Sequence, residues 1–374
     1  MEGLIRPTVA RIDLDALRHN FSVIRREVGE DVRVLAPVKG TAYGHGAIPC
    51  ALALQDVGCD AFGVALVEEG VALRQAGVEA EIICLGGVGS RGPEEAVAWD
   101  LTPMVYDLDT ARALSKVAMA EGKVVPIHLK IDTGMGRLGV LPHDWEAFLQ
   151  SLLDLEGLRV EGIATHFCDA DLAEDGFTEE QGNRFRAALD EASGQGVEAR
   201  WIHASNSAAA LRYQNYRYSM VRVGLALYGV SPGPHREMGL KPVMSVTTEV
   251  LHVKTVPQGW GVSYGRTWTA RKEARLATLP VGYADGYPRA LSNVGEVLIH
   301  GRRCAVRGAV CMDLCLVDVT HLEETVKPGD EVVLLGEESG EELGAWELAE
   351  RADTIAYDIL CSFSERVPRR FKGA

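Results

Sequence analysis

The chain has 374 residues, of which 47% are hydrophobic and 24% are charged, values typical of a folded globular protein. A disordered or fibrous chain is therefore excluded, and the length predicts about two domains or one large barrel with an appendage. The 38 lysines and arginines stand against 53 acidic residues, which gives a net charge of −15. This charge disfavours nucleic acid and membrane surfaces as partners, although a few local donors could still hold a small anion.

The cysteines and the N-terminal segment indicate the compartment. The eight cysteines are scattered along the chain and never form a C-x-x-C pair, a pattern that favours reducing conditions. The first residues, MEGLIRPTVARIDLD, carry charges every few positions and lack the apolar stretch of a signal peptide. No window reaches the roughly 18 apolar residues of a membrane span. We therefore expect a cytoplasmic protein.

Short apolar segments alternate with helical patterns through the first part of the chain. The expected strands are 32–38, 62–66, 81–85, 102–106, 125–131, 158–167, 200–204 and 221–229. Before the first of them, the spacing of Leu14, Leu17, Phe21 and Ile24 places all four side chains on one face of a helix. Eight such alternations predict a (β/α)8 TIM barrel. An open doubly wound sheet is the structural alternative.

After about Gly239 the pattern changes to longer extended segments. These are 243–256, 274–283, 296–300, 309–320 and 330–336, with turns at 300–303 and 328–330. They predict an antiparallel β domain. Two helical segments, 344–352 and 354–362, follow within it, and the segment 231–242 is the best candidate for the boundary between the two domains.

Two segments match the G-x-G-x-x-G pattern of dinucleotide-binding loops. They are Gly87–Gly92, after the third expected strand, and Gly134–Gly139, after the fifth. A true fingerprint belongs to the first strand–helix turn of its fold and has an acidic residue about 20 positions further on. A chain with 40 glycines also matches so loose a pattern by chance. We therefore do not expect a dinucleotide site.

Lys39 ends the first barrel strand, in the segment VRVLAPVKGTAYGHG. The carboxyl ends of barrel strands are where barrel enzymes place their chemistry. A lone lysine at such a place is usually only solvated. Here Tyr43 and the glycines Gly40, Gly44 and Gly46 follow it in a compact loop of donors and bare backbone. Such surroundings suit a lysine that acts as a Schiff-base nucleophile.

At these residues the sequence resembles the alanine racemases, pyridoxal phosphate (PLP) enzymes of fold type III. VKGTAYGHG is similar to their cofactor-lysine signature, V-K-A-[ND]-A-Y-G-H-G. The resemblance continues in order through segments that span nearly the whole chain: 128–139, 165–167, 203–209, 221–229, 262–268, 279–289, 310–313 and 357–369. It implies a barrel at 11–240 and a mostly β domain at 241–374 that residues 1–10 join.

The resemblance also implies a reaction. The chain would be a homodimeric isomerase that uses PLP to interconvert L-alanine and D-alanine and so supplies D-alanine for peptidoglycan. Lys39 would bind PLP covalently and act as the base on one face of the substrate Cα, and Tyr264 of the partner subunit would act on the other face. Racemisation requires two such bases, because a base on one face returns the proton to where it came from.

Further roles are implied for residues around these two bases. Arg222 would face the pyridine nitrogen of PLP and keep it unprotonated, which favours racemisation over transamination. The phosphate group would be held by Tyr43, Ser207, the backbone of Gly224 and Tyr357. The substrate carboxylate would be bound by Arg137 and by the backbone N–H of Met312.

Supporting roles complete the implied site, and no metal ion is expected. They fall to a carbamylated Lys130 that orients Arg137, to Asp313 beside Tyr264 and to Tyr283 at the entrance, and His166 would contact the cofactor beside the tyrosine base. Several positions near the site depart from the family pattern and could affect substrate choice: Pro37, Gly40, Thr41, Cys168 and Leu314. Pro37 is unexpected because proline removes a hydrogen-bond donor from a central strand.

Three alternatives remain open. The first is a broad-specificity or serine racemase on the same scaffold, and the second is a fold-type III decarboxylase. Arg222 argues against a decarboxylase, which is expected to place an acidic group at the pyridine nitrogen. The third is a non-enzymatic PLP-binding protein, which would resemble the barrel alone; the β domain that carries Tyr264 argues against it.

Overall fold

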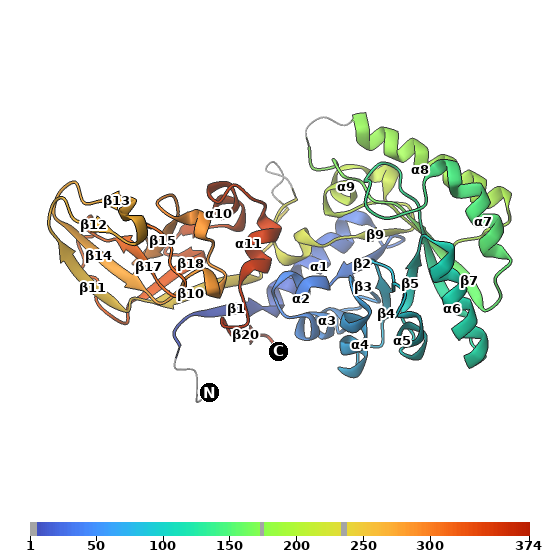
Figure 1. The fold of residues 1–374 in the computed structure, drawn as a ribbon, viewed down its shortest axis with the longest axis horizontal. Helices are drawn as coiled ribbons and strands as arrows, with labels where there is room; N and C mark the ends of the chain where they lie inside the picture. Colours follow the sequence, from blue (N-terminus) through green and yellow to red (C-terminus); the bar gives the residue numbers. More distant parts are fainter. Residues whose placement is uncertain (1–5, 173–175, 233–237) are drawn as a thin grey trace. The chain divides into compact units, whose positions relative to one another are not determined.

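The computed structural model describes residues 6–172, 176–232 and 238–374, and the chain forms two units (Figure 1). One unit contains Leu17–Ala42 and Ala47–Leu240. The other contains the described residues up to Ala16, the short segment Tyr43–Gly46, and Lys241–Ala374. The expected boundary segment 231–242 and the expected contribution of residues 1–10 each include positions outside the described residues.

The first unit is a barrel of parallel strands that alternate with helices (Figure 1). Its strands are β2 (Arg33–Pro37), β3 (Ala61–Val64), β4 (Glu81–Cys84), β5 (Thr102–Val105), β6 (Val125–Lys130), β7 (Leu158–Ala164), β8 (Trp201–His203) and β9 (Met220–Arg222). Its helices are α1 (Leu14–Val28), α3 (Ala47–Gln55), α4 (Val67–Gln75), α5 (Pro93–Ala98), α6 (Leu108–Glu121), α7 (Trp145–Leu153), α8 (Gly176–Gly194) and α9 (Ser207–Arg212). Within the described ranges, no helix has the length and apolar character needed to span a membrane.

The eight strands confirm the predicted barrel, and the open doubly wound sheet is wrong. Their order is β8-β7-β6-β5-β4-β3-β2-β9, so the first barrel strand pairs with the last. The backbone N–H of Arg222, at the end of β9, donates to the carbonyl of Ser205, just past β8, at 2.9 Å. This bond brings the two edges of the sheet together and nearly closes the barrel.

Two apolar patterns show what the sequence could and could not resolve. Leu14, Leu17, Phe21 and Ile24 all lie in α1 and are buried, as their spacing predicts. The expected strand 221–229 instead ends at Arg222 and continues as a short 3-10 helix, Leu225–Tyr228. Every side chain of that helix is buried, and an uninterrupted apolar run has no alternation that distinguishes a strand from a helical turn.

Pro37 fits because it is the last residue of β2. The pairing of β2 with β9 involves Arg33 to Leu35 only, and it ends before the proline. The Pro37 carbonyl accepts a hydrogen bond from the Tyr228 hydroxyl at 2.8 Å. At a strand end the missing N–H of proline removes no bond that the sheet requires. The predicted conflict with a central strand therefore does not arise.

The second unit is mostly β, as predicted. Its largest sheet has the order β16-β15-β18-β10-β1-β20, with β19 beside β18; a second sheet has the order β11-β14-β17, and β12 and β13 form a hairpin. The strands are β1 (Val9–Asp13), β10 (Met244–Glu249), β11 (His252–Val256), β12 (Gly261–Val262), β13 (Trp268–Thr269), β14 (Ala274–Leu279), β15 (Glu296–Ile299), β16 (Arg302–Ala305), β17 (Cys315–Asp318), β18 (Glu331–Glu338), β19 (Glu341–Leu343) and β20 (Arg369–Lys372). Its helices are α10 (Ala345–Arg351) and α11 (Ala356–Ser362).

A buried carboxylate ties distant segments of this unit together. Asp285 has no exposed surface, and its Oδ2 lies 2.6 Å from Arg6 Nη2. Arg366 Nε lies 3.1 Å from Asp285 Oδ1. The backbone N–H of Gly282 also donates to Oδ2, at 2.9 Å. Asp285 thus joins an N-terminal residue, a loop and the C-terminal segment through one side chain.

We predict that Asp285→Asn lowers the free energy of unfolding by about 2 kcal/mol, less than for a fully buried pair because Arg6 and Arg366 remain partly solvated. Urea unfolding followed by circular dichroism measures the change. The matched control is Asp109→Asn, which breaks an exposed 3.1 Å pair with Arg112 and should have no measurable effect. Equal stability of both variants would contradict the role assigned to Asp285.

Candidate active site

The chain makes an unusual left-handed turn directly after Lys39. The segment drawn as α2 (Lys39–Tyr43) has positive φ at four successive residues, 58° at Gly40, 56° at Thr41 and Ala42, and 53° at Tyr43. Such a conformation costs roughly 1–2 kcal/mol for each residue other than glycine. Two bonds support the turn: Gly40 N–H donates to Glu69 Oε1 at 2.7 Å, and Ala42 N–H donates to the Val38 carbonyl at 2.8 Å.

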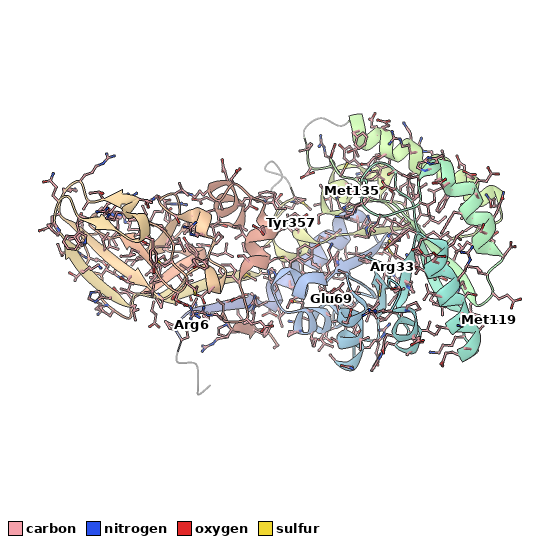
Figure 2. The ribbon with its side chains drawn as sticks, viewed as in Figure 1. Arg6, Arg33, Glu69, Met119, Met135 and Tyr357 are labelled. Atoms are coloured by element: carbon pink, nitrogen blue, oxygen red, sulfur yellow. The ribbon has the colours of Figure 1, made fainter. Side chains whose placement is uncertain are left out.

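The turn explains why glycine suits position 40, but it makes threonine at position 41 conformationally strained. Glycine adopts the left-handed conformation at no steric cost, so Gly40 relieves strain at a position where the signature has alanine. Thr41 stands where the signature has asparagine or aspartate, which tolerate this conformation far better than a β-branched residue does. Glu69 (Figure 2) also accepts hydrogen bonds from Ala65 and Leu66, so a single carboxylate connects this turn to the start of α4.

Arg222 is the most completely engaged side chain of the barrel mouth. It is only 6% exposed. Its Nη1 donates to both Nδ1 and the carbonyl of His203, each at 2.9 Å. Its Nη2 lies 2.8 Å from the Thr165 carbonyl, 2.9 Å from the Ala204 carbonyl and 3.0 Å from His166 Nδ1. Its Nε–H has no acceptor among the described residues, so one donor of a fixed guanidinium remains for a ligand.

Several positive charges act on the same small volume. Burial lowers the pKa of Arg222 to about 10, with a further contribution from Arg137, so Arg222 stays charged at neutral pH. Burial also lowers the pKa of Lys130 well below its usual value, assisted by the charges of Arg222 and Arg137. The pKa of His166 falls for the same reasons, and the charges that act on it include Lys39. An anion bound here would gain from the charges of Arg222, Arg137 and Lys39.

Arg137 is held on a glycine-rich loop after β6. Asp132 Oδ1 accepts the backbone N–H groups of Gly134, at 2.9 Å, and Gly136, at 3.1 Å. A Cβ on Gly139 would lie 2.4 Å from the Asp132 nitrogen, and φ at Gly139 is 132°, so only glycine fits there. The second G-x-G-x-x-G segment is thus a tight turn that presents an exposed arginine.

Gln181 of α8 fixes the two loops that carry Arg137 and His166, and the sequence did not single it out. It is fully buried. Its Nε2 donates to the His166 carbonyl at 3.0 Å and to Thr133 Oγ1 at 3.2 Å, while its Oε1 accepts from the Cys168 N–H at 3.1 Å. Its position within an amphipathic helix contains no signal of this role, because a buried amide looks like any other polar residue in the sequence.

Two more residues missed by the sequence interpretation lie behind Arg222. His203 contacts Arg222 directly, and His128 lies 2.8 Å from His203. Both are the first letters of segments that resemble the family, 128–139 and 203–209. That position was the one signal that could have identified them.

The residues expected at the phosphate group fall in both units. Ser207 is buried at the start of α9, where the Asn206 side chain caps the helix by accepting from the Ala209 N–H at 3.0 Å. In the other unit, the ring centroids of Tyr43 and Tyr357 lie 5.7 Å apart; Figure 2 labels Tyr357. Burial raises the pKa of Tyr43, so its hydroxyl stays protonated and can donate. The joint role of these residues remains a prediction.

Tyr264 occupies a short 3-10 helix, Tyr264–Arg266, between β12 and β13, and is 76% exposed. Ser263 precedes it with φ at 61°, and its hydroxyl donates to the Ala309 carbonyl at 2.6 Å. The loop that contains Ala309 also carries Met312. Tyr264 and the Met312 loop are thus tied together by one serine side chain.

Met312, Tyr283 and Asp313 also belong to this exposed region. The backbone N–H of Ala284 donates to the Met312 carbonyl at 3.0 Å, which brings Tyr283 and Met312 together. Asp313 Oδ1 accepts from Arg366 Nη2 at 2.7 Å. The expected contact of Asp313 with Tyr264 remains a prediction.

Comparison with known proteins identifies the family. The sequence model of the alanine racemase N-terminal domain matches residues 12–232, and that of the C-terminal domain matches residues 243–371. An alanine racemase of Halothermothrix orenii is 42% identical over 99% of this chain and 98% of its own. The alanine racemase of Streptomyces coelicolor has a TM-score of 0.95 at 37% identity, with 99% of both chains covered.

A further solved structure bears on the cofactor. The alanine racemase of Bartonella henselae, solved with covalently bound pyridoxal phosphate, has a TM-score of 0.90 at 28% identity and covers 98% of this chain and 99% of its own. The two domain matches together span both units, and the relatives match end to end. The chain therefore belongs to the alanine racemase family, whose members are PLP-dependent isomerases.

Proposed function

We propose that Lys39 and Tyr264 are the two proton-transfer groups with which this chain interconverts L-alanine and D-alanine. The observation that carries the proposal is the group of positive side chains at the carboxyl ends of the barrel strands, where Lys39 emerges from β2. This is the edge at which barrel enzymes bind their substrates. The matched relatives are alanine racemases, so a serine or broad-specificity racemase, a decarboxylase and a non-enzymatic carrier are not favoured.

The donors of this barrel end suit PLP, which carries a phosphate and a phenolic oxygen. Lys39, Arg137 and Arg222 act on His166 as positive charges, so an anionic ligand would relieve their mutual repulsion. Arg222 keeps its Nε–H for the cofactor because its terminal nitrogens are engaged by the barrel. Ser207 and the backbone of Gly224 would donate to the phosphate from neutral groups.

The proposed roles follow from where each group lies. Bound PLP withdraws electrons from the amino acid and so makes its Cα–H bond acidic. Lys39 would take or return the Cα proton on one face, and the Tyr264 hydroxyl would do so on the opposite face. Arg222 cannot accept a proton, so it would leave the pyridine nitrogen unprotonated and limit charge withdrawal, which favours prompt reprotonation at Cα over transamination.

The substrate carboxylate would bind to Arg137 and to the backbone N–H of Met312. The lowered pKa of Lys130 supports its proposed carbamylation, because an uncharged amine is the form that reacts with carbon dioxide. The resulting anion would orient Arg137. Tyr283 would line the entrance and Asp313 would position Tyr264.

We further propose a homodimer in which each subunit supplies Tyr264 to its partner. Tyr264 is 76% exposed and Met312 is 53% exposed, so both side chains have surface that a second copy could cover. Tyr264 therefore lies where a second copy can use it. All eight cysteines are free thiols, which supports a cytoplasmic location. Supply of D-alanine for peptidoglycan is the corresponding role.

We predict that Lys39→Ala abolishes covalent attachment of PLP, because no other side chain is proposed to bond to it. Borohydride treatment followed by mass spectrometry of the intact protein measures the attachment. Lys116→Ala, which removes an exposed lysine of α6, is the matched control and should retain the cofactor. A cofactor still fixed to the Lys39 variant would overturn the assignment.

We predict that Tyr264→Phe slows proton exchange mainly for one enantiomer, by roughly 10²- to 10⁴-fold, because only one face loses its base. Incubation of L-alanine and of D-alanine in heavy water, with analysis of deuterium and chirality at Cα, measures each direction. Equal slowing of exchange from both enantiomers would contradict the two-face scheme. Sedimentation analysis controls for loss of the dimer.

A mixture of Lys39→Ala and Tyr264→Phe subunits should regain activity that neither variant has alone. Random reassociation makes half of the dimers mixed, and each mixed dimer has one complete site out of two, so we expect about a quarter of the unmodified rate. Activity after denaturation and joint refolding measures this. No recovery, with mixed dimers demonstrated by mass spectrometry, would show that Tyr264 does not act across subunits.

A further inference from the structure

A line of polar side chains, which begins at the partly exposed Glu81 and continues through buried groups, runs through the inside of the barrel to Arg222. Glu81 is the first residue of β4, His128 lies within β6, His203 ends β8 and Arg222 ends β9. The line therefore starts at the amino-terminal edge of the sheet and ends at the carboxyl-terminal edge. Both histidines are completely buried. Barrel interiors are normally filled by branched apolar side chains, so two adjacent imidazoles need an explanation.

The barrel makes room for His128. Gly162 of β7 lies opposite His128 in the register of the sheet, and a Cβ on Gly162 would lie 2.6 Å from His128 Nδ1. The pairing of β6 with β7 also shifts its register between Ile127 and His128. A larger residue at position 162 would thus displace the imidazole. The backbone around His128 is adapted to hold that ring in place.

The hydrogen bonds in this line have only one consistent direction. Arginine cannot accept a hydrogen bond, so Nδ1 of His203 must accept from Arg222 Nη1 at 2.9 Å. A neutral His203 then carries its proton on Nε2 and donates it to His128 Nδ1 at 2.8 Å. His128 in turn carries its proton on Nε2, which faces Glu81 Oε1 at 3.8 Å. Each ring therefore has one assigned tautomer.

Neutral histidines are the state that this environment favours. Burial and the charges of Arg33 (Figure 2) and Arg222 lower the pKa of His128 to about 3, opposed only in part by Glu161. Burial lowers the pKa of His203 well below its usual value, with Arg222 as the next contribution. A charged His203 would also place a donor against the donor of Arg222. The order of the protons thus depends on both rings remaining neutral.

We propose that His128 is a positioning residue for Arg222: by accepting from His203 Nε2, it locks His203 in the tautomer that accepts from the guanidinium. Without this acceptor, the Nε2–H of the fully buried His203 would be unpaired, which favours moving the proton to Nδ1, where it would oppose the Arg222 N–H. The guanidinium would then lose one of the contacts that hold it beside the cofactor. The positioning role rests on the proposed function of Arg222, whereas the assignment of Nε2–H tautomers to His128 and His203 does not.

Three variants distinguish the loss of the hydrogen-bond acceptor at position 128 from a change in side-chain volume. His128→Leu keeps an apolar side chain of similar size and removes the acceptor. His128→Asn retains an acceptor oxygen near the position of Nδ1, and it should therefore keep the His203 proton on Nε2. Met104→Leu is the matched control, because Met104 lies beside His128 in the sheet and in the barrel core but makes no polar contact with the line.

The first readout uses the protein without added PLP. Proton–nitrogen correlation spectra of the chain labelled with ¹⁵N-histidine distinguish Nε2–H from Nδ1–H tautomers. In the unmodified protein, His128 and His203 should both be Nε2–H. His203 should change to a mixed or Nδ1–H state in His128→Leu, and should remain Nε2–H in His128→Asn and Met104→Leu. Nδ1–H or doubly protonated rings in the unmodified protein would overturn the proposal, whatever the variants do.

The second readout is kinetic and uses the PLP-loaded enzyme. His128→Leu should lower kcat in both directions by roughly threefold to tenfold with little change in KM, since Arg222 acts on the cofactor and not on the substrate. His128→Asn should recover most of this loss. An unchanged His203 tautomer and unchanged kcat in His128→Leu would overturn the positioning role. An unmodified protein with the predicted tautomers and no racemase activity would instead contradict the proposed function alone.

Discussion

The burial of one guanidinium is the constraint on which the candidate site depends. Arg222 lies inside the barrel mouth, where an unpaired charge would be strongly unfavourable. Instead of a carboxylate, three backbone carbonyls and two neutral imidazole nitrogens surround it. Neutral acceptors bind the N–H groups of the two terminal nitrogens without cancelling the charge. The positive charge therefore remains available to a ligand.

The partners of Arg222 lie at or just past the ends of strands β7 and β8, and Arg222 itself ends β9. Thr165 and His166 follow β7, Ala204 follows β8, and Arg222 ends β9. The carbonyls of Thr165, His203 and Ala204 accept hydrogen bonds from the guanidinium, so the ends of β7 and β8 are joined to β9 through it. The bond from the Arg222 N–H to the Ser205 carbonyl adds the backbone to the same junction. One residue thus serves both closure of the barrel and electrostatics of its mouth.

Surrounding contacts also impose the strained turn after Lys39. Three successive residues other than glycine adopt positive φ there, which persists only where the surroundings impose it. Glu69 holds one end of the turn through the Gly40 N–H. The lysine is therefore presented by a backbone with few alternatives. A fixed backbone of this kind would hold Lys39 in position to reach the substrate Cα.

The sequence by itself determined the alternation of strands and helices, the change to a β unit near residue 240, and the identity of Lys39 as a group at a strand end. These follow from local periodicity and from motif order, which are properties of neighbouring residues. It did not determine Gln181, His128 or His203, because their importance arises from contacts between residues 13 to 75 positions apart. The left-handed turn, the tolerated Pro37 and the direction of the hydrogen bonds that run from Arg222 through His203 to His128 were likewise decided only by tertiary structure. Each depends on which donor or acceptor a distant segment brings into contact with the residue, and local sequence patterns do not predict such contacts.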